Sequence, residues 1–207
     1  MFSLLSHLYT TYLTPPPSTL LILGLDSSGK TTLLEALKQL HSSSSGQAQL
    51  NPDQIRPTVG VNCVKLDHPL SKVTAYDPSG APASRSLWSH YYEDCSAIIF
   101  VLDSGEVDRA EEVSLVYGSV MGEVGRGKGG VPVAVFANKR DLAGERHALT
   151  KLDLEDILPA DSRRTVRYFE GSAREACGSE KGTGRGGGEE VRAMMEWVVR
   201  EGVRKKR

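Results

Sequence analysis

The 207-residue sequence predicts an α/β domain with a mostly parallel sheet, and three features support this fold class. Short apolar runs, typical of strands buried on both faces, alternate with stretches whose apolar residues recur at helical spacing. A glycine-rich turn separates the first apolar run from the first helical stretch. The apolar content of 39% and charged content of 25% are those of a folded domain. The net charge of −1 offers no basic field for binding nucleic acid.

The order of the expected elements indicates crossover connections between parallel strands. Strands that alternate with helices form such units, with right-handed crossovers. The serine-rich residues 41–49 read as a loop. Strands are expected at residues 19–23, 61–66, 73–76, 97–103, 131–138 and 165–171. Helices are expected at residues 29–40, 107–121, 152–158 and 189–203.

The first 14 residues predict an amphipathic helix, because apolar residues recur at three- and four-residue steps. Prolines at 15–17 end this helix, so residues 15–18 form a stiff linker and residues 19–207 the main domain. The helix either packs on the domain or lies on a membrane surface. Its polar interruptions and missing basic flank argue against a signal peptide, and position 2 lacks the glycine needed for myristoylation. The residues expected to meet a membrane or receptor are Met1, Phe2, Leu5, Leu8, Tyr9 and Tyr12.

Cysteines, histidines and most glycines carry no functional signal. Three widely spaced cysteines form no disulfide framework, which favours a reducing intracellular setting, and the five histidines are isolated. The segments 125–130 and 182–188 each contain GxGxxG, but neither follows an expected strand in a βαβ unit. We interpret both as flexible loops, and residues 178–188 as a glycine-rich insertion.

The segment between the first strand and first helix predicts a phosphate-binding loop. Gly24, Gly29, Lys30 and Thr31 match GxxxxGK[ST] in the required strand-to-helix context. Glycines let backbone N–H groups converge on phosphate oxygens, and the helix start adds its positive dipole end. The lysine side chain binds the outer phosphates, and the threonine hydroxyl is a Mg²⁺ ligand. The alternative is a tight turn without a ligand. The loop residues expected to bind nucleotide are Gly24, Leu25, Asp26, Ser27, Ser28, Gly29, Lys30, Thr31 and Thr32.

A second motif indicates which base is bound. Asn138, Lys139 and Asp141 form NKxD at the end of a buried apolar run. The Asp141 carboxylate accepts the N1–H and 2-amino hydrogens of guanine, a donor pair that adenine lacks. The lysine stem packs along the ring.

With these two motifs in place, the sequence resembles the Arf family of small GTPases over nearly its whole length. Residues 24–34 resemble the family's P-loop, residues 56–60 its switch I, and residues 76–80 and 85–92 its switch II. The resemblance also includes Asp103-Ser104, Asp108-Arg109 and Ser172-Ala173. It implies a single P-loop GTPase domain with a six-stranded sheet in the order 2-3-1-4-5-6, the second strand antiparallel.

The resemblance also implies roles for residues outside the P-loop. Thr58 joins Thr31 as a Mg²⁺ ligand and senses the γ-phosphate, while Asp77 holds a Mg²⁺-bound water. The Gly80 N–H contacts the γ-phosphate. Ala173, next to Ser172, presents its N–H to the guanine O6. The implied ligands are GTP or GDP with Mg²⁺.

The sequence departs from the family where hydrolysis is concerned. Ala81 replaces the glutamine that orients the attacking water, so no catalytic residue is assigned. Pro78 and Ser79 make the loop stiffer than a glycine pair would. Asp26 adds a like charge near the γ-phosphate.

The nucleotide motifs predict a GTP/GDP-binding protein, and the resemblance implies a Mg²⁺-dependent switch that recruits effectors to Golgi membranes in vesicle trafficking. The start Met1-Phe2 is similar to the Golgi Arf-related GTPases, which implies cytoplasmic and Golgi-membrane residence and a membrane receptor. An exchange factor, a GTPase-activating protein and effectors are implied partners; nucleic acid is not. The alternative is a GTP-binding scaffold with negligible hydrolysis. A P-loop nucleoside kinase would have no use for Asn138 and Asp141. The basic end 204–207 is either a solvated helix end or an added attraction to anionic lipid.

Overall fold

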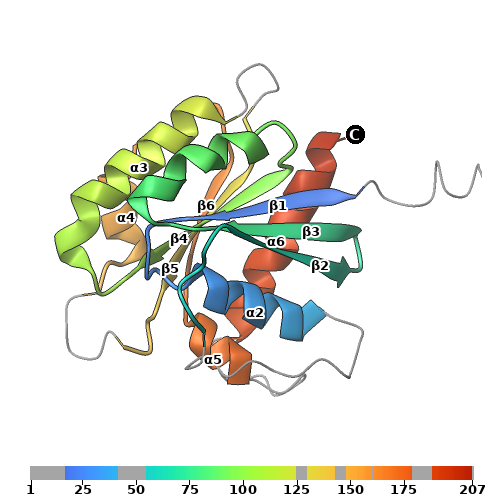
Figure 1. The fold of residues 1–207 in the computed structure, drawn as a ribbon, viewed down its shortest axis with the longest axis horizontal. Helices are drawn as coiled ribbons and strands as arrows, with labels where there is room; N and C mark the ends of the chain where they lie inside the picture. Colours follow the sequence, from blue (N-terminus) through green and yellow to red (C-terminus); the bar gives the residue numbers. More distant parts are fainter. Residues whose placement is uncertain are drawn as a thin grey trace, which may run out of the picture.

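A computed structural model describes residues 17–41, 55–124, 130–142, 148–159, 161–178 and 188–206. The predicted helix at the N-terminus and most of both glycine-rich segments lie outside these residues. The described part forms a six-stranded sheet covered by helices (Figure 1). The strands are β1 (Ser18–Leu23), β2 (Val61–His68), β3 (Ser71–Pro78), β4 (Ala97–Asp103), β5 (Val133–Asn138) and β6 (Val166–Glu170).

The strand order is β2-β3-β1-β4-β5-β6, which confirms the predicted topology. Strand β2 pairs antiparallel with β3, and all other neighbours pair in parallel. The two-residue turn Pro69-Leu70 sets the β2–β3 register, in which His68 faces Ser71 and Asn62 faces Asp77. The hairpin is longer than predicted, because both strands continue through polar residues to this turn.

The central strands are buried on both faces, as their apolar runs predict. In β1, Leu20 and Ile22 enter one core, while Leu21 and Leu23 enter the other. Successive residues of a strand point to opposite faces, so a run without polar residues needs helices on both sides.

Helices cover both faces (Figure 1). On one face pack α2 (Lys30–His41), α5 (Ala173–Gly178) and α6 (Gly188–Lys206). On the other pack the 3-10 helix η2 (Pro82–Tyr91), α3 (Ala110–Glu123) and α4 (Lys151–Ile157). A short 3-10 turn, η3 (Val107–Arg109), leads into α3, so the helix expected from residue 107 is split in two.

Two helical elements were not predicted from the sequence. Helix η2 begins with Pro82 in its first turn and buries Trp88, which is only 1% exposed. Helix α5 begins after Ser172, whose hydroxyl accepts a hydrogen bond from the Glu175 N–H at 3.1 Å. Proline at a helix start and Ser-x-x-Glu before a helix are both sequence signals of a helix N-terminus, although each helix is short.

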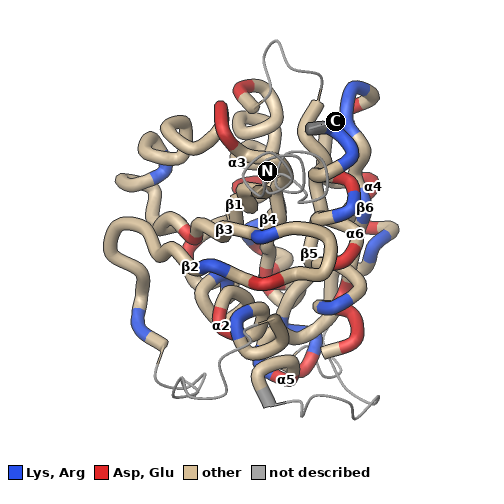
Figure 2. Tube along the Cα trace, turned by 90° about the vertical axis from the view of Figure 1, so that its right-hand side faces the viewer, with Lys and Arg blue, Asp and Glu red and all other residues tan. Residues whose placement is uncertain are grey.

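Charge is interspersed over the described surface. Figure 2 shows acidic and basic residues alternating along α6 and β6. Among the described residues, no helix is both long enough and apolar enough to span a bilayer.

Phe100 offers a test of the β4 core. Its ring lies edge-on to Tyr117 with centroids 5.2 Å apart, and the side chain is fully buried. We expect Phe100→Ala to lower the free energy of unfolding by ~3–5 kcal/mol, because transfer and cavity terms add. Urea unfolding measures this, with Leu152→Ala on exposed α4 as the control expected to change stability by less than ~0.5 kcal/mol. Equal losses in both variants would contradict this packing.

Candidate functional site

The predicted binding residues meet at the carboxyl edge of the sheet. The loops after β1, β3, β5 and β6 carry, in turn, the P-loop, Gly80, Asn138 and Ser172. In open α/β sheets, ligands bind at the carboxyl ends of the strands. The fold therefore brings segments separated by up to about 150 residues in sequence to one edge.

Glycines of the P-loop occupy positions that a side chain would disturb. Gly24 has φ +142° and Gly29 has φ +90°, both in the range that L residues rarely adopt. A Cβ on Gly24 would collide with the Val101 carbonyl oxygen, and one on Gly29 with the Asn138 amide. The motif glycines are thus needed both for backbone shape and for close approach to neighbouring loops.

Lys30 is held inside the loop. Its side-chain amine donates a 2.6 Å hydrogen bond to the Leu25 carbonyl, and the residue is 6% exposed. Burial lowers the pKa of this amine to about 8, against the opposing effect of nearby Asp77. Electrostatic attraction to bound phosphate would favour the charged form.

Three oxygen-bearing side chains converge beside Lys30. The Thr31 and Thr58 hydroxyls lie 2.8 Å apart, and the Thr31 hydroxyl donates to Asp77 Oδ2 at 2.7 Å. The Asn62 amide donates to Thr58 Oγ1 and Asp77 Oδ2, each at 3.2 Å. The residues for which the resemblance implies Mg²⁺ contact are therefore adjacent, held by an amide that the sequence analysis did not identify.

The donor set fits Mg²⁺. Asp77 is fully buried, and none of the described residues offers a hydrogen bond to its Oδ1. Burial raises the pKa of this carboxyl, although bonds from Thr31 and Asn62 oppose the shift. Hydroxyl and carboxylate oxygens suit a hard cation. Among the described residues, no group of three or more His, Cys, Asp or Glu side chains is arranged to hold a metal ion, so Mg²⁺ would also need phosphate and water oxygens.

Asn138 joins three loops on the other side of the P-loop. Its side-chain amide donates to the Ser28 carbonyl at 2.8 Å and accepts from the Ala173 N–H at 2.9 Å. The backbone carbonyl of Asn138 accepts a hydrogen bond from the Ser104 hydroxyl at 2.8 Å. The first residue of NKxD therefore positions the loops.

A cavity of about 160 Å³ lies next to Asn138 and has the residues expected around a base. Lys139 adopts φ +64°, and its amine lies 2.7 Å from Asp103 Oδ2, which holds its stem at the cavity. Asp141 is exposed and lines the cavity, where its carboxylate is accessible to a ligand. The lining residues are Gly29, Thr32, Asn138, Lys139, Asp141, Leu142, Ser172 and Arg174.

The switch II segment closes the phosphate end. Gly80 is buried, and a Cβ there would collide with Lys30 Nζ and lie 2.6 Å from the Gly24 carbonyl oxygen. Ala81 follows as the N-cap of η2 without a side-chain cap bond, so it supplies no polar atom beyond its backbone. Asp26 is not an isolated like charge, because Arg109 pairs with it at 2.8 Å.

Several predicted residues remain untested by this geometry. The candidate membrane contacts Met1, Phe2, Leu5, Leu8, Tyr9 and Tyr12 lie outside the described residues.

Ser27, with φ +60°, is exposed at the loop tip, whereas Leu25 and Ser28 are buried. One signal could have found Asn62: the two-residue hairpin turn places it directly opposite Asp77.

A P-loop, an NKxD loop and a switch segment on this six-stranded sheet define the small GTPase class of nucleotide-binding proteins. The model of the ADP-ribosylation factor (Arf) family matches residues 7–185. The chain belongs to the Arf family and is a GTP-binding switch protein.

Curated relatives and a solved structure agree with this assignment. ADP-ribosylation factor-related protein 1 from rat and from human are each 33% identical over 205 residues, covering 99% of this chain and 94% of theirs. ADP-ribosylation factor-like protein 3 of Saccharomyces cerevisiae is 37% identical over 142 residues, 68% of this chain and 69% of that protein. The Arl6 small GTPase of Trypanosoma brucei, with bound nucleotide analogue GppNp, aligns with a TM-score of 0.66 at 26% identity. That alignment covers 92% of this chain and 99% of the other.

Asp141 is expected to select the base. Replacing it in Asp141→Asn removes one of two acceptors for guanine donors, so GDP affinity should fall about tenfold or more and the preference over adenine nucleotides should shrink. Competition of GTP and ATP against labelled GDP measures both effects. Asp156→Asn, an exposed change on α4, is the matched control. Unchanged discrimination in Asp141→Asn would remove this carboxylate from base recognition.

Proposed function

We propose that this protein is a Mg²⁺-dependent GTP/GDP switch that recruits effectors to Golgi membranes in vesicle trafficking. The observation that supports nucleotide binding most strongly is the convergence of Thr31, Thr58 and Asp77 beside Lys30, at one end of an edge whose other end carries the Asp141 cavity. Along this edge, Lys30 therefore lies where phosphate would bind. Thr31, Thr58 and Asp77 lie where Mg²⁺ would bind, and Asp141 lies where the base would bind.

In this proposal, each group has a distinct task. Lys30 neutralises phosphate charge, and Gly24 and Gly29 keep the loop open to phosphate oxygens. Thr31 and Thr58 supply metal ligands, with Asp77 acting through water. Bound Mg²⁺ supplies charge neutralisation between the phosphates. Asn138 holds the base loops together by accepting from the Ala173 N–H, the group that the resemblance assigns to the guanine O6.

The membrane part of the proposal rests on sequence and on relatives. The apolar spacing of Phe2, Leu5 and Leu8 supports an interfacial helix, and the Arf-related proteins match almost the whole chain. We propose that an exchange factor, a GTPase-activating protein, effectors and a Golgi membrane receptor act on this protein on the cytosolic face.

A second candidate is a GTP-binding scaffold with negligible hydrolysis. Ala81 supports it, because its methyl group cannot orient the attacking water, and its cap position carries no polar side chain. An arginine supplied by a partner would still act in trans.

Single-turnover hydrolysis tests the scaffold candidate. We expect purified protein to bind Mg²⁺–GTP and to hydrolyse it very slowly. Ala81→Gln should raise the rate by about tenfold or more if the glutamine reaches the attacking water, since a glutamine at this place orients that water in related GTPases. Ala83→Gln, two residues along the exposed start of η2, is the matched control and should leave the rate unchanged. Rapid hydrolysis by the unmodified protein, with no partner added, would overturn the scaffold candidate.

Membrane flotation tests the location. Residues 2–13 should bring the form loaded with a GTP analogue to liposomes more than the GDP form, as a switch requires a different partner for the apolar face in each state. Phe2→Ser with Leu5→Ser should lower partitioning at least about tenfold, because each buried side chain contributes ~1.5–3 kcal/mol. Thr10→Ala with Thr11→Ala on the polar face is the control. Equal partitioning of both nucleotide forms would show that membrane binding by these residues does not depend on the bound nucleotide, which would contradict the prediction.

A further inference from the structure

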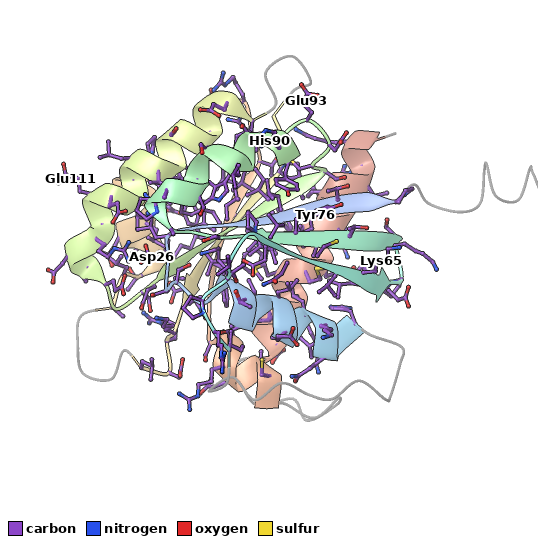
Figure 3. All side chains as sticks on the ribbon, viewed as in Figure 1. Asp26, Lys65, Tyr76, His90, Glu93 and Glu111 are labelled. Atoms are coloured by element: carbon purple, nitrogen blue, oxygen red, sulfur yellow. The ribbon has the colours of Figure 1, made fainter. Side chains whose placement is uncertain are left out.

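Five charged side chains meet beside the P-loop. Arg109 Nη2 lies 2.8 Å from Asp26 Oδ1, its Nε lies 3.0 Å from Glu112 Oε2, and its Nη1 lies 3.2 Å from Glu106 Oε2. Arg85 reaches the same group, with Nη2 2.8 Å from Glu112 Oε1 and 3.8 Å from Asp26 Oδ1. In Figure 3, Asp26 stands at the end of the sheet beside the start of α3.

The arginines favour the charged forms of two carboxyl groups in this network. Hydrogen bonding from Arg109 holds the pKa of Asp26 below its usual range, and hydrogen bonding from Arg85 does the same for Glu112. The network therefore links η2, the P-loop and α3 by ion pairs.

Arg85 also holds the backbone of switch II. Its Nε donates to the Gly80 carbonyl at 3.0 Å, while Trp88 Nε1 donates to the Ser79 carbonyl at 3.0 Å. These carbonyls belong to the two peptide units that flank the Gly80 Cα. Because a trans peptide points its C=O and N–H in opposite directions, the Trp88 bond turns the Gly80 N–H away from η2.

Gly80 has little freedom on its other side. It lies against Lys30 Nζ and the Gly24 carbonyl so closely that no Cβ would fit. The glycine is thus held between the P-loop lysine and two side chains of η2. Ala81 adds no polar side-chain contact to this arrangement.

We infer that Arg85 is a positioning residue that sets the preference of this site for a nucleoside triphosphate over a diphosphate. The inference rests on the proposed nucleotide-binding function. Arg85 fixes the Gly80 peptide next to Lys30, where the terminal phosphate of a triphosphate adds charge that a diphosphate lacks. Glu112 anchors Arg85, and Asp26 draws the guanidinium toward the P-loop.

The charges around the site also favour a nucleoside triphosphate over a diphosphate. A terminal phosphate is attracted by Lys30 and repelled by Asp26, whose charge is offset by Arg109 and, at longer range, Arg85. Removing Arg85 loosens Gly80 and leaves more of the Asp26 charge facing the phosphate. Both effects weaken triphosphate binding while leaving the base and inner phosphates in place.

The test compares affinities of the full chain for Mg²⁺–GDP and for Mg²⁺ with a non-hydrolysable GTP analogue. Arg85→Ala should weaken analogue binding about tenfold or more relative to GDP, as expected for loss of a charge-assisted hydrogen bond. Glu112→Gln should shift the ratio in the same direction by less. Glu111→Gln makes the same charge change one residue away, on an exposed side chain that points outward from α3 (Figure 3), and should leave the ratio unchanged.

Thermal melting of each variant accompanies these measurements. If Arg85→Ala does not fold, Arg85→Lys replaces it, because a lysine keeps the charge but cannot form the two-pronged contact with Gly80 and Glu112. A smaller shift of the ratio in the same direction would then support the inference. Equal weakening of both nucleotides, or an unchanged ratio, would overturn the positioning role and leave the switch function standing. Failure of the unmodified protein to bind either nucleotide would overturn both.

Discussion

The side-chain amide of Asn138 is the contact on which the binding edge depends. It connects the Ser28 carbonyl to the Ala173 N–H and so ties the end of β5 to the P-loop and to the start of α5. Without an amide at this position, two buried backbone groups would lose their partners, which costs more than the bonds themselves contribute. The base cavity and the shape of the P-loop therefore share one support.

The sequence predicted most of the fold, since the buried strands are apolar runs with few alternatives. The sequence also indicated the P-loop and NKxD residues, whose spacing reflects local backbone geometry. It did not find Asn62, because its role follows from the hairpin register, nor Arg85 and Glu112, which meet only through tertiary packing. Helix η2 was also not predicted, since Trp88 is the one buried residue among its ten, and sequence signals for helices depend on several buried apolar positions.

The two ends of the nucleotide site are supported by different kinds of contact. Around the base, neutral hydrogen bonds of the Asn138 side chain to buried backbone groups join the loops, beside a single ion pair between Lys139 and Asp103. Around the phosphates, ion pairs between partly exposed side chains hold η2 to the P-loop and α3. Contacts of that kind weaken as ionic strength rises. The phosphate end is thus the more readily altered part of the site.

Among the described residues, strand β2 lies at the edge of the sheet and pairs only with β3, and its position has a consequence for solubility. Unpaired edge strands offer N–H and C=O groups to other chains, and flat apolar edges promote assembly into extended sheets. Here the outward face carries Lys65 and Asp67 with Cys63, whereas Leu66 faces inward. A strand from another molecule that paired beside β2 would bring its own side chains next to these charged groups. The edge thereby disfavours uncontrolled growth of the sheet from one molecule to the next.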